Sequence, residues 1–375
     1  MSEVVFSQDD PKVRKDAALK RERVRDFLVQ QNLEGVLISR RDNFAWVTSG
    51  GDNHVLKNSE IGVGHIAITR DRHYLLAHSM DAARLYQEQV PGQEYELVSL
   101  RWFQGDPRCA AVDLVNGKWA ADTMFNDEVP NVNQALSILH YPLTELEMER
   151  CRWLGEQVGR ILCKVAQVVH PGQREDEVAS YLWIECLKLG IELDVLIVGS
   201  DERIFHYRHP LPTSKRIERY VLIHPAARRW GLHANVSRSV YFGTPSNEIK
   251  RAYRAAAQLQ AGLLERLTPG LAFSEIFNWQ KQKYAELGFP DEWKNHFQGG
   301  PTGYVVVDAL RHTTPSTVQV NQAFDWFITI TGSKVEELTL LSKDGVEIPS
   351  FQSPWPSYQP NQNGNGLGVP DLWVL

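Results

Sequence analysis

The chain has 375 residues, 43% of them hydrophobic, which is enough for two domains with cores of their own. Its 40 basic and 46 acidic side chains give a formal net charge of −6 without a sustained basic stretch, so we expect no nucleic-acid partner. A polar N-terminus, the lack of a membrane-spanning apolar run and four cysteines without a CxxC pair exclude a secretory signal, a membrane segment and a disulfide framework, and predict a cytoplasmic protein.

The first part of the chain alternates helix and strand signals. Apolar residues spaced among charged ones over 17–31 predict a surface helix that Gly35 ends. Short apolar runs bounded by turn residues then predict strands. These strands are 36–38, 44–48, 64–69 and 73–77, the last two forming a hairpin. The pattern predicts an α/β domain over residues 1–141.

A junction is predicted at residues 141–144. Pro142 interrupts the periodicity, and Thr144 with Glu147 three positions later is a capping-box signal for a helix running to residue 169. The segments that follow predict further helices at 175–189, 247–267 and 273–287 and strands at 194–198, 220–224, 235–242, 323–331 and 337–341. Helix pairs against antiparallel strands predict an α+β domain over 142–348, and the Pro, Asn and Gly of 349–375 predict an extended C-terminal arm.

An ordered set of short signals covers residues 142–348. It consists of His170-Pro171-Gly172 after a helix, Gly199 followed by His206-Tyr207, the strand 220–224, the stretch from Gly231 to Arg238, Thr268-Pro269-Gly270, the glycine turn 299–303, and Lys334-Val335-Glu336. In this order they resemble the pita-bread fold of methionine aminopeptidases, prolidases, aminopeptidase P and creatinase. The first part of the chain resembles the creatinase-type N-terminal domain.

The resemblance implies a two-metal centre, which this sequence matches poorly. The family's first two aspartates correspond to His224 and Asn235, eleven residues apart. The remaining ligand positions correspond to Gly300, a residue near Phe327, and Glu336, and a His-Glu pair found in many relatives corresponds to Val307-Asp308. One carboxylate cannot balance two divalent ions in a low-dielectric cleft. The sequence therefore predicts no dinuclear metal and no cofactor; a single ion held by His224, Glu336 and His233 or Asp325 stays open.

The family's catalytic histidine is matched by His206, eighteen positions before His224. In creatinase, which works without metal, the corresponding residue is the general base, and an imidazole can both take and return a proton near neutral pH. We predict His206 and Glu336 as catalytic, with Glu336 orienting a cationic or amidine-like group. The residues predicted to bind substrate are Tyr207, His224, Asn235, Arg238 and His296.

Three functions follow from this pattern. The first is a metal-independent, creatinase-like hydrolase or lyase acting on a C–N bond of a small polar substrate or short peptide. The second is an inactive pita-bread protein that serves as a binding module, and the third is an Xaa-Pro peptidase with an atypical metal site. The resemblance also implies a homodimer, to which Trp46, Asp52, Asn53 and His54 are hypothetical interface contributors.

Overall fold

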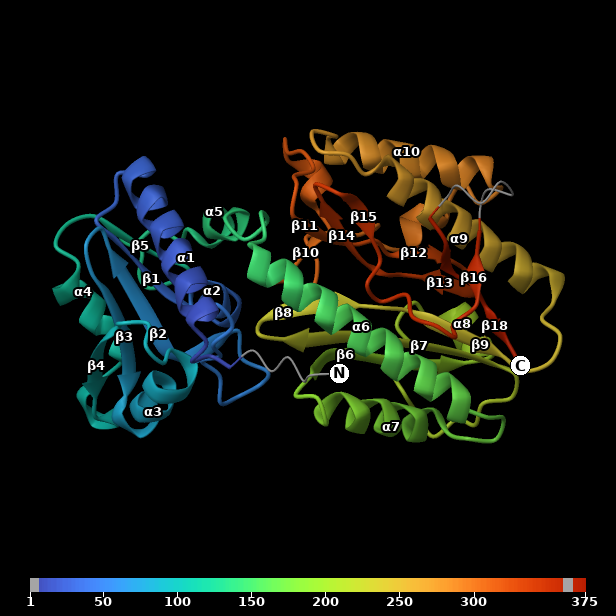
Figure 1. Cartoon of the computed structure of the whole chain (residues 1–375), viewed down its shortest axis with the longest axis horizontal. Helices are drawn as coiled ribbons and strands as arrows, with labels where there is room; N and C mark the ends of the chain where they lie inside the picture. Colours follow the sequence, from blue (N-terminus) through green and yellow to red (C-terminus); the bar gives the residue numbers. More distant parts are fainter. Residues whose placement is uncertain (1–6, 360–366) are drawn as a thin grey trace. The chain divides into compact units, whose positions relative to one another are not determined.

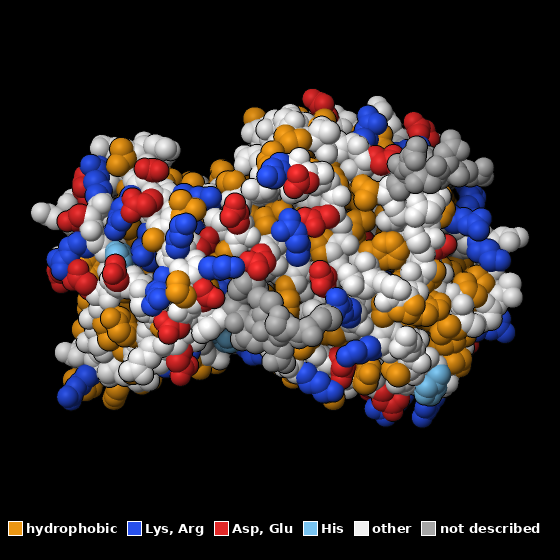
Figure 2. Space-filling model, viewed as in Figure 1, with side chains coloured by type: hydrophobic (Ala, Val, Ile, Leu, Met, Phe, Trp, Pro, Cys, Tyr) orange, Lys and Arg blue, Asp and Glu red, His pale blue; other side chains and the backbone are white. Residues whose placement is uncertain are grey.

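The computed structural model describes residues 7–359 and 367–375 and divides the chain into two units, Met1–His140 and Tyr141–Leu375. We refer to them as the N-terminal and C-terminal domains. Within the described residues, none of the helices combines the length and the apolar character that crossing a membrane requires. On the face seen in Figure 2, basic and acidic side chains are interspersed.

The N-terminal domain is built on one mixed sheet with the strand order β4-β3-β2-β1-β5. Its helices are α1 (Pro11–Gln30), α2 (Arg41–Val47), α3 (Ser79–Arg84), α4 (Ala110–Leu114) and α5 (Asn133–Ile138), and its strands are β1 (Gly35–Arg40), β2 (Ile61–Thr69), β3 (His73–His78), β4 (Glu96–Leu100) and β5 (Trp119–Ala121). β2 and β3 form the predicted antiparallel hairpin, and β1 pairs parallel with β5. The α/β class predicted for this domain is confirmed.

The strand predicted at 44–48 is wrong, because these residues lie in and just after helix α2. The apolar run Phe44–Val47 is buried on all sides, and a short run buried all round has no periodicity that separates strand from helix. Trp46 and Asn53 are both 0% exposed. They cannot contact a second protomer in this conformation, so the interface role suggested for these two residues is not supported, while the homodimer itself stays a prediction.

The C-terminal domain combines two larger sheets with two pairs of helices. Its helices are α6 (Glu145–Val168), α7 (Glu175–Leu187), α8 (Glu202–His206), α9 (Asn247–Arg266) and α10 (Phe273–Glu286). Its strands are β6 (Glu192–Ser200), β7 (Tyr220–Arg229), β8 (Leu232–Asn235), β9 (Arg238–Tyr241), β10 (Gly300–Thr302), β11 (Gln322–Asp325), β12 (Ile328–Ile330), β13 (Ser333–Val335), β14 (Leu338–Ser342), β15 (Gly345–Glu347), β16 (Ser357–Tyr358), β17 (Val369–Pro370) and β18 (Trp373–Val374).

The two helix pairs cover different strands. Figure 1 shows α6 and α7 running along β6 and β7, and α9 beside β12 and β13 with α10 next to it. The predicted capping box starts α6: Thr144 accepts from the Glu147 backbone and Glu147 accepts from the Thr144 backbone. One sheet has the order β18-β9-β7-β6 with β8 on β7, and the other has the order β10-β11-β14-β15. This is the predicted α+β architecture.

The long strand β7 carries the centre of the domain. Every residue from Tyr220 to Arg228 is buried, and the strand pairs antiparallel with β6, β8 and β9. A two-residue turn of Trp230 and Gly231 links β7 to β8, with φ of 54° and 79°. Left-handed φ at both turn positions matches the right-handed twist of the paired strands. The turn therefore fixes the register that sets His224 and Asn235 in place.

The described part of the predicted C-terminal arm packs on the C-terminal domain. β16 pairs with β17, and β18 joins β9 as a parallel edge strand. Trp355 and Val369 are 4% and 0% exposed. Their apolar side chains complete the core of this domain, so the described arm residues form part of the fold; residues 360–366 lie outside the described residues.

Candidate functional site

The loop that carries His206 is fastened at both ends by a buried carboxylate. Glu175 is 0% exposed and accepts hydrogen bonds from the Ser200 backbone (2.8 Å) and from the Thr213 hydroxyl (2.7 Å). Arg203 in the same loop also donates to it. Charge-assisted bonds from three points of one segment hold it firmly. The course of residues 200–213 is therefore set by this anchor.

Within this loop, His206 and His209 are both exposed but have different neighbours. His206 is the last residue of α8 and is exposed beside Tyr207, which is itself 54% exposed. Three residues on, Pro210 packs so closely on Gly199 that a Cβ there would lie 2.3 Å from the proline ring. This contact places the neighbouring His209 next to His296, with 3.0 Å between their Nε2 atoms. The structure thus pairs His209, rather than His206, with a predicted site residue.

A buried polar cluster lies at the centre of the C-terminal domain, around Glu336. Glu336 is 0% exposed, and its Oε2 lies 3.2 Å from His224 Nδ1 and 2.9 Å from Lys334 Nζ. Ser237 donates to the same oxygen over 3.0 Å and lies 3.2 Å from His224 Nδ1. Burial, with the Lys334 charge as a smaller cause, holds the pKa of His224 well below its usual value, so His224 is neutral.

A second carboxyl belongs to this cluster. Asp325 is 0% exposed and accepts a hydrogen bond from Asn235, whose Nδ2 also donates to the Val306 carbonyl over 2.8 Å. Burial first, and then the negative charge of Glu336, raise the pKa of Asp325 well above its ordinary value. Asp325 therefore holds a proton more readily than an ordinary aspartate does. We call His224, Asn235, Ser237, Asp325, Lys334 and Glu336 the Glu336 cluster.

The imidazole pair lies within electrostatic reach of this cluster, because the Lys334 charge acts on both rings and His296 contacts the Phe327 ring. His296 Nδ1 lies 2.6 Å from the Phe297 carbonyl, so Nδ1 carries the proton and Nε2 accepts from His209 Nε2. This order leaves Nδ1 of His209 as the unprotonated nitrogen. Burial lowers the pKa of His209 and lowers that of His296 to about 4, and the Lys334 charge adds to both shifts. Both rings are neutral at physiological pH.

The remaining predicted residues divide between the cluster and the rest of the fold. His224, Asn235 and Glu336 come together as predicted, and His296 lies at the edge of the cluster. Arg238 is 1% exposed and is bound to Glu337, the Ser350 carbonyl (2.8 Å) and the Ser237 carbonyl (2.9 Å). Its place is a buried structural ion pair, which does not support the predicted contact with substrate. His206 and Tyr207 are exposed on the loop, and their roles stay predictions.

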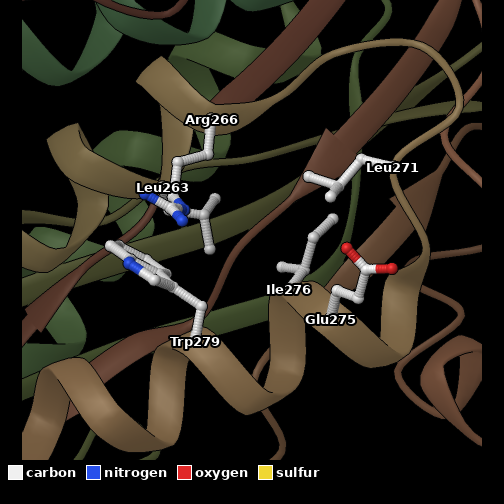
Figure 3. A pocket seen from close by; sticks show the side chains of 6 residues that line it. All are labelled: Leu263, Arg266, Leu271, Glu275, Ile276 and Trp279. Atoms are coloured by element: carbon white, nitrogen blue, oxygen red, sulfur yellow. The ribbon is translucent and has the colours of Figure 1, made fainter.

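A small pocket lies away from these residues, between α9 and α10. Figure 3 shows the Arg266 side chain next to the Trp279 ring, with 5.1 Å between the guanidinium carbon and the ring centroid. The pocket measures about 60 Å³, much less than a site for a small molecule usually needs. Its lining residues are Leu263, Arg266, Leu271, Glu275, Ile276 and Trp279. None of them belongs to the Glu336 cluster.

These features define a class: a two-domain pita-bread protein with a buried polar cluster in its C-terminal domain. Residues 149–324 match the model of metallopeptidase family M24. The C-terminal domain is therefore a member of the M24 pita-bread superfamily. The fold of the chain is that of the prolidases, since the prolidase from Pyrococcus horikoshii superposes with a TM-score of 0.75 at 18% identity, over 88% of this chain and 98% of that one.

Sequence comparison gives distant relatives of the same kind. The chain is 21% identical to the Xaa-Pro dipeptidase of Pyrococcus horikoshii over 366 residues, which cover 87% of this chain and 95% of that protein. It is 22% identical to the probable dipeptidase PepE of Mycobacterium tuberculosis over 276 residues, which cover 65% of this chain and 72% of that protein. The similarity spans both domains.

The residues present do not fit the metal ions that the family name implies. Within the described C-terminal domain, no three His, Cys, Asp or Glu side chains each bring a ligand atom within 4.8 Å of the others. At Gly300 a Cβ would lie 2.4 Å from the Asp308 carbonyl oxygen, which leaves no room for a histidine. The Lys334 ammonium bonds to the carboxylate that a metal would need. We derive no chemistry through a metal for this site.

Sequence reasoning placed Asp325 with His224 and Glu336 as one option for a single-ion site, but it missed Lys334 and Ser237 as members of the cluster and His209 as the partner of His296. Lys334 stands two residues before Glu336, so its charge was available as a signal. For His209, counting residues back from His224 pointed to the histidine that ends α8. The contact between His209 and His296 joins distant segments, next to the close packing of Pro210 on Gly199.

Proposed function

We propose that this protein is a metal-independent hydrolase that cleaves an amide-type C–N bond in a small polar substrate or short peptide. The observation that carries the proposal is the neutral imidazole pair, His209 Nε2 to His296 Nε2 at 3.0 Å, which lies close enough to Lys334 of the Glu336 cluster for its charge to act on both rings. The names of the similar proteins, Xaa-Pro dipeptidase and probable dipeptidase, support the substrate class.

In this reaction His209 is the general base and His296 holds it in position. The bond from His209 Nε2–H to His296 Nε2 fixes the tautomer of His209, which leaves Nδ1 free to take a proton. Nδ1 removes a proton from water as the oxygen adds to the substrate carbonyl carbon. When the C–N bond breaks, the imidazolium returns that proton to the leaving nitrogen, so that atoms and charge balance.

The charge that develops on the carbonyl oxygen needs a nearby positive group. The Lys334 ammonium acts on both imidazoles, because its charge lowers the pKa of His209 and of His296. A fixed charge in a water-poor site stabilises an oxyanion without rearrangement. In this proposal the Lys334 charge stabilises the oxyanion, as a Lewis acid does in metal-dependent hydrolysis.

The test is a hydrolysis screen on chelator-treated protein. Xaa-Pro dipeptides, other dipeptides and small amides are offered, and the released amine is measured for the wild type, His209→Asn, His206→Asn and His296→Gln. We expect activity that survives the chelator, a loss of at least about 100-fold in His209→Asn, and little change in His206→Asn. Activity that needs added metal, or that depends on His206 and not on His209, contradicts the assignment.

A second candidate, the binding module, is favoured by the burial of the Glu336 cluster. Glu336, Asp325 and Asn235 are 0% exposed, and His224 and Lys334 are 4% and 3% exposed. Polar groups enclosed in this way in the core do not reach a substrate. If the screen gives no turnover but a peptide binds and His209→Asn leaves the binding unchanged, this function replaces the first. Stoichiometric metal in active wild type favours instead the peptidase with an atypical metal site.

A further inference from the structure

A lysine is buried inside the core of this pita-bread domain, where the proposed reaction uses its charge but does not account for its burial. Lys334 is 3% exposed, on the short strand β13. Its Nζ lies 2.9 Å from Glu336 Oε2 and 5.4 Å from the centre of the Phe327 ring. Burying an ammonium group is costly unless a charge partner compensates for it.

The partner of Lys334 is at the position where the family places a metal ligand. Glu336 corresponds to the last metal-binding glutamate of the family, and its Oε2 accepts from both Lys334 and Ser237. Asn235 corresponds to a family aspartate and here donates to Asp325. The ring of Phe327, near another ligand position, offers its face to the ammonium. Glu336 and Phe327 thus form a setting for one small cation, and Asn235 binds the neighbouring Asp325.

We infer that the Lys334 ammonium is a built-in cation that occupies the place of the metal in this fold and excludes divalent ions from it. It carries one positive charge against the single charge of Glu336. It also keeps a fixed charge beside the imidazole pair when no metal is available. The inference deepens the proposed function, but it concerns binding of metal and is measured without any substrate.

The perturbation is Lys334→Met, which keeps the length and apolar stem of the side chain and removes the charge. Without the ammonium, Glu336 has no cation, and its carboxylate, with His224 Nδ1 3.2 Å away, is available to Zn²⁺, which accepts nitrogen and oxygen ligands. Lys283→Met is the matched control, because Lys283 pairs with Glu286 on the surface of the same domain at 30% and 65% exposure.

Metal content and thermal unfolding are measured after exhaustive dialysis against a chelator, with and without added Zn²⁺. For the wild type and Lys283→Met we expect no bound metal and no Zn²⁺ effect on the unfolding temperature. For Lys334→Met we expect a lower unfolding temperature that Zn²⁺ raises, with a Zn²⁺ dissociation constant at least roughly tenfold below that of the wild type. The double variant Lys334→Met/Glu336→Gln should lose this response.

Two results overturn the inference. One is stoichiometric metal in the wild type that Glu336→Gln removes, which would put an ion where we place the ammonium. The other is a folded Lys334→Met variant that responds to Zn²⁺ no more than the wild type does. If Lys334→Met does not fold, the comparison of wild type with Glu336→Gln decides, because only a metal-free wild type agrees with the inference. A negative hydrolysis screen leaves these outcomes unaffected.

Discussion

The titration of His296 tests the electrostatics of the imidazole pair directly. Burial, reinforced by the Lys334 charge, lowers the pKa of this ring from 6.5 to about 4, against the opposing effect of its bond to the Phe297 carbonyl. A shift of this size corresponds to about 3 kcal/mol favouring the neutral ring. At pH 5.5 a ring with a pKa of about 4 is about 97% neutral, whereas an ordinary histidine is about 9% neutral.

The assay is NMR of the histidine Cε1–Hε1 groups across pH 3.5–8, with the His296 signal assigned from its loss in His296→Gln. We expect a midpoint near 4 and, in Lys334→Met, a higher midpoint, because the cation that opposes protonation is gone. The acid limb of any hydrolysis should lie correspondingly low. A His296 midpoint near 6.5 in the folded wild type would refute both the burial and the charge argument.

Three further predictions concern the framework. Burial lowers the pKa of His140 from 6.5 to about 3 in the folded protein, so the folded state loses stability as the pH falls from 6.5 toward 3. His140→Phe should reduce the loss of stability between pH 7 and pH 5 by about 2 kcal/mol in urea unfolding. Arg238→Met leaves the Glu337 charge buried and should cost about 3–5 kcal/mol by the same measurement. Gly199→Ala forces a Cβ to within 2.3 Å of Pro210 and should cost about 1–3 kcal/mol and shift the His209 NMR signal.

An exposed ion pair provides the control for the arginine variant. Arg152 and Glu347 lie 2.7 Å apart with 40% and 37% of their side chains exposed. Arg152→Met should change stability by less than about 1 kcal/mol, because solvent screens such pairs. Equal losses in the two arginine variants would contradict the role we give to burial. For His140, a urea midpoint whose pH dependence is the same in His140→Phe would show that another group titrates.

The order of elements could be predicted because capping and turn residues mark where the long elements begin and end. Thr144 with Glu147 predicts the start of α6 to the residue, and the alternation around 70–72 predicts the β2–β3 hairpin. The error at 44–48 has a physical cause, since a short segment buried on every side gives no period to read. Local signals therefore predict most of the framework, but they do not separate helix from strand where a short segment is buried on every side.

The site could be predicted only where its chemistry is local to a strand. His224 and Asn235 face one region because the Trp230–Gly231 turn fixes the pairing of β7 with β8, a relation readable from spacing. The pairing of His209 with His296 joins segments 87 residues apart. Its geometry depends on how Pro210 packs, which spacing does not encode.

Two consecutive residues of one segment bind two consecutive carboxylates of another. Ser237 bonds to Glu336 while its neighbour Arg238 bonds to Glu337, so two adjacent carboxylates have separate partners. Because Arg238 is bound to Glu337, the charge of Glu336 is left to Lys334, while burial and the Glu336 charge raise the pKa of Asp325. The Lys334 ammonium and the Glu336 carboxylate therefore offset each other. Two divalent ions would bring four further positive charges beside a carboxylate that already has its cation, so the described cluster suits an internal ammonium better than a pair of metal ions.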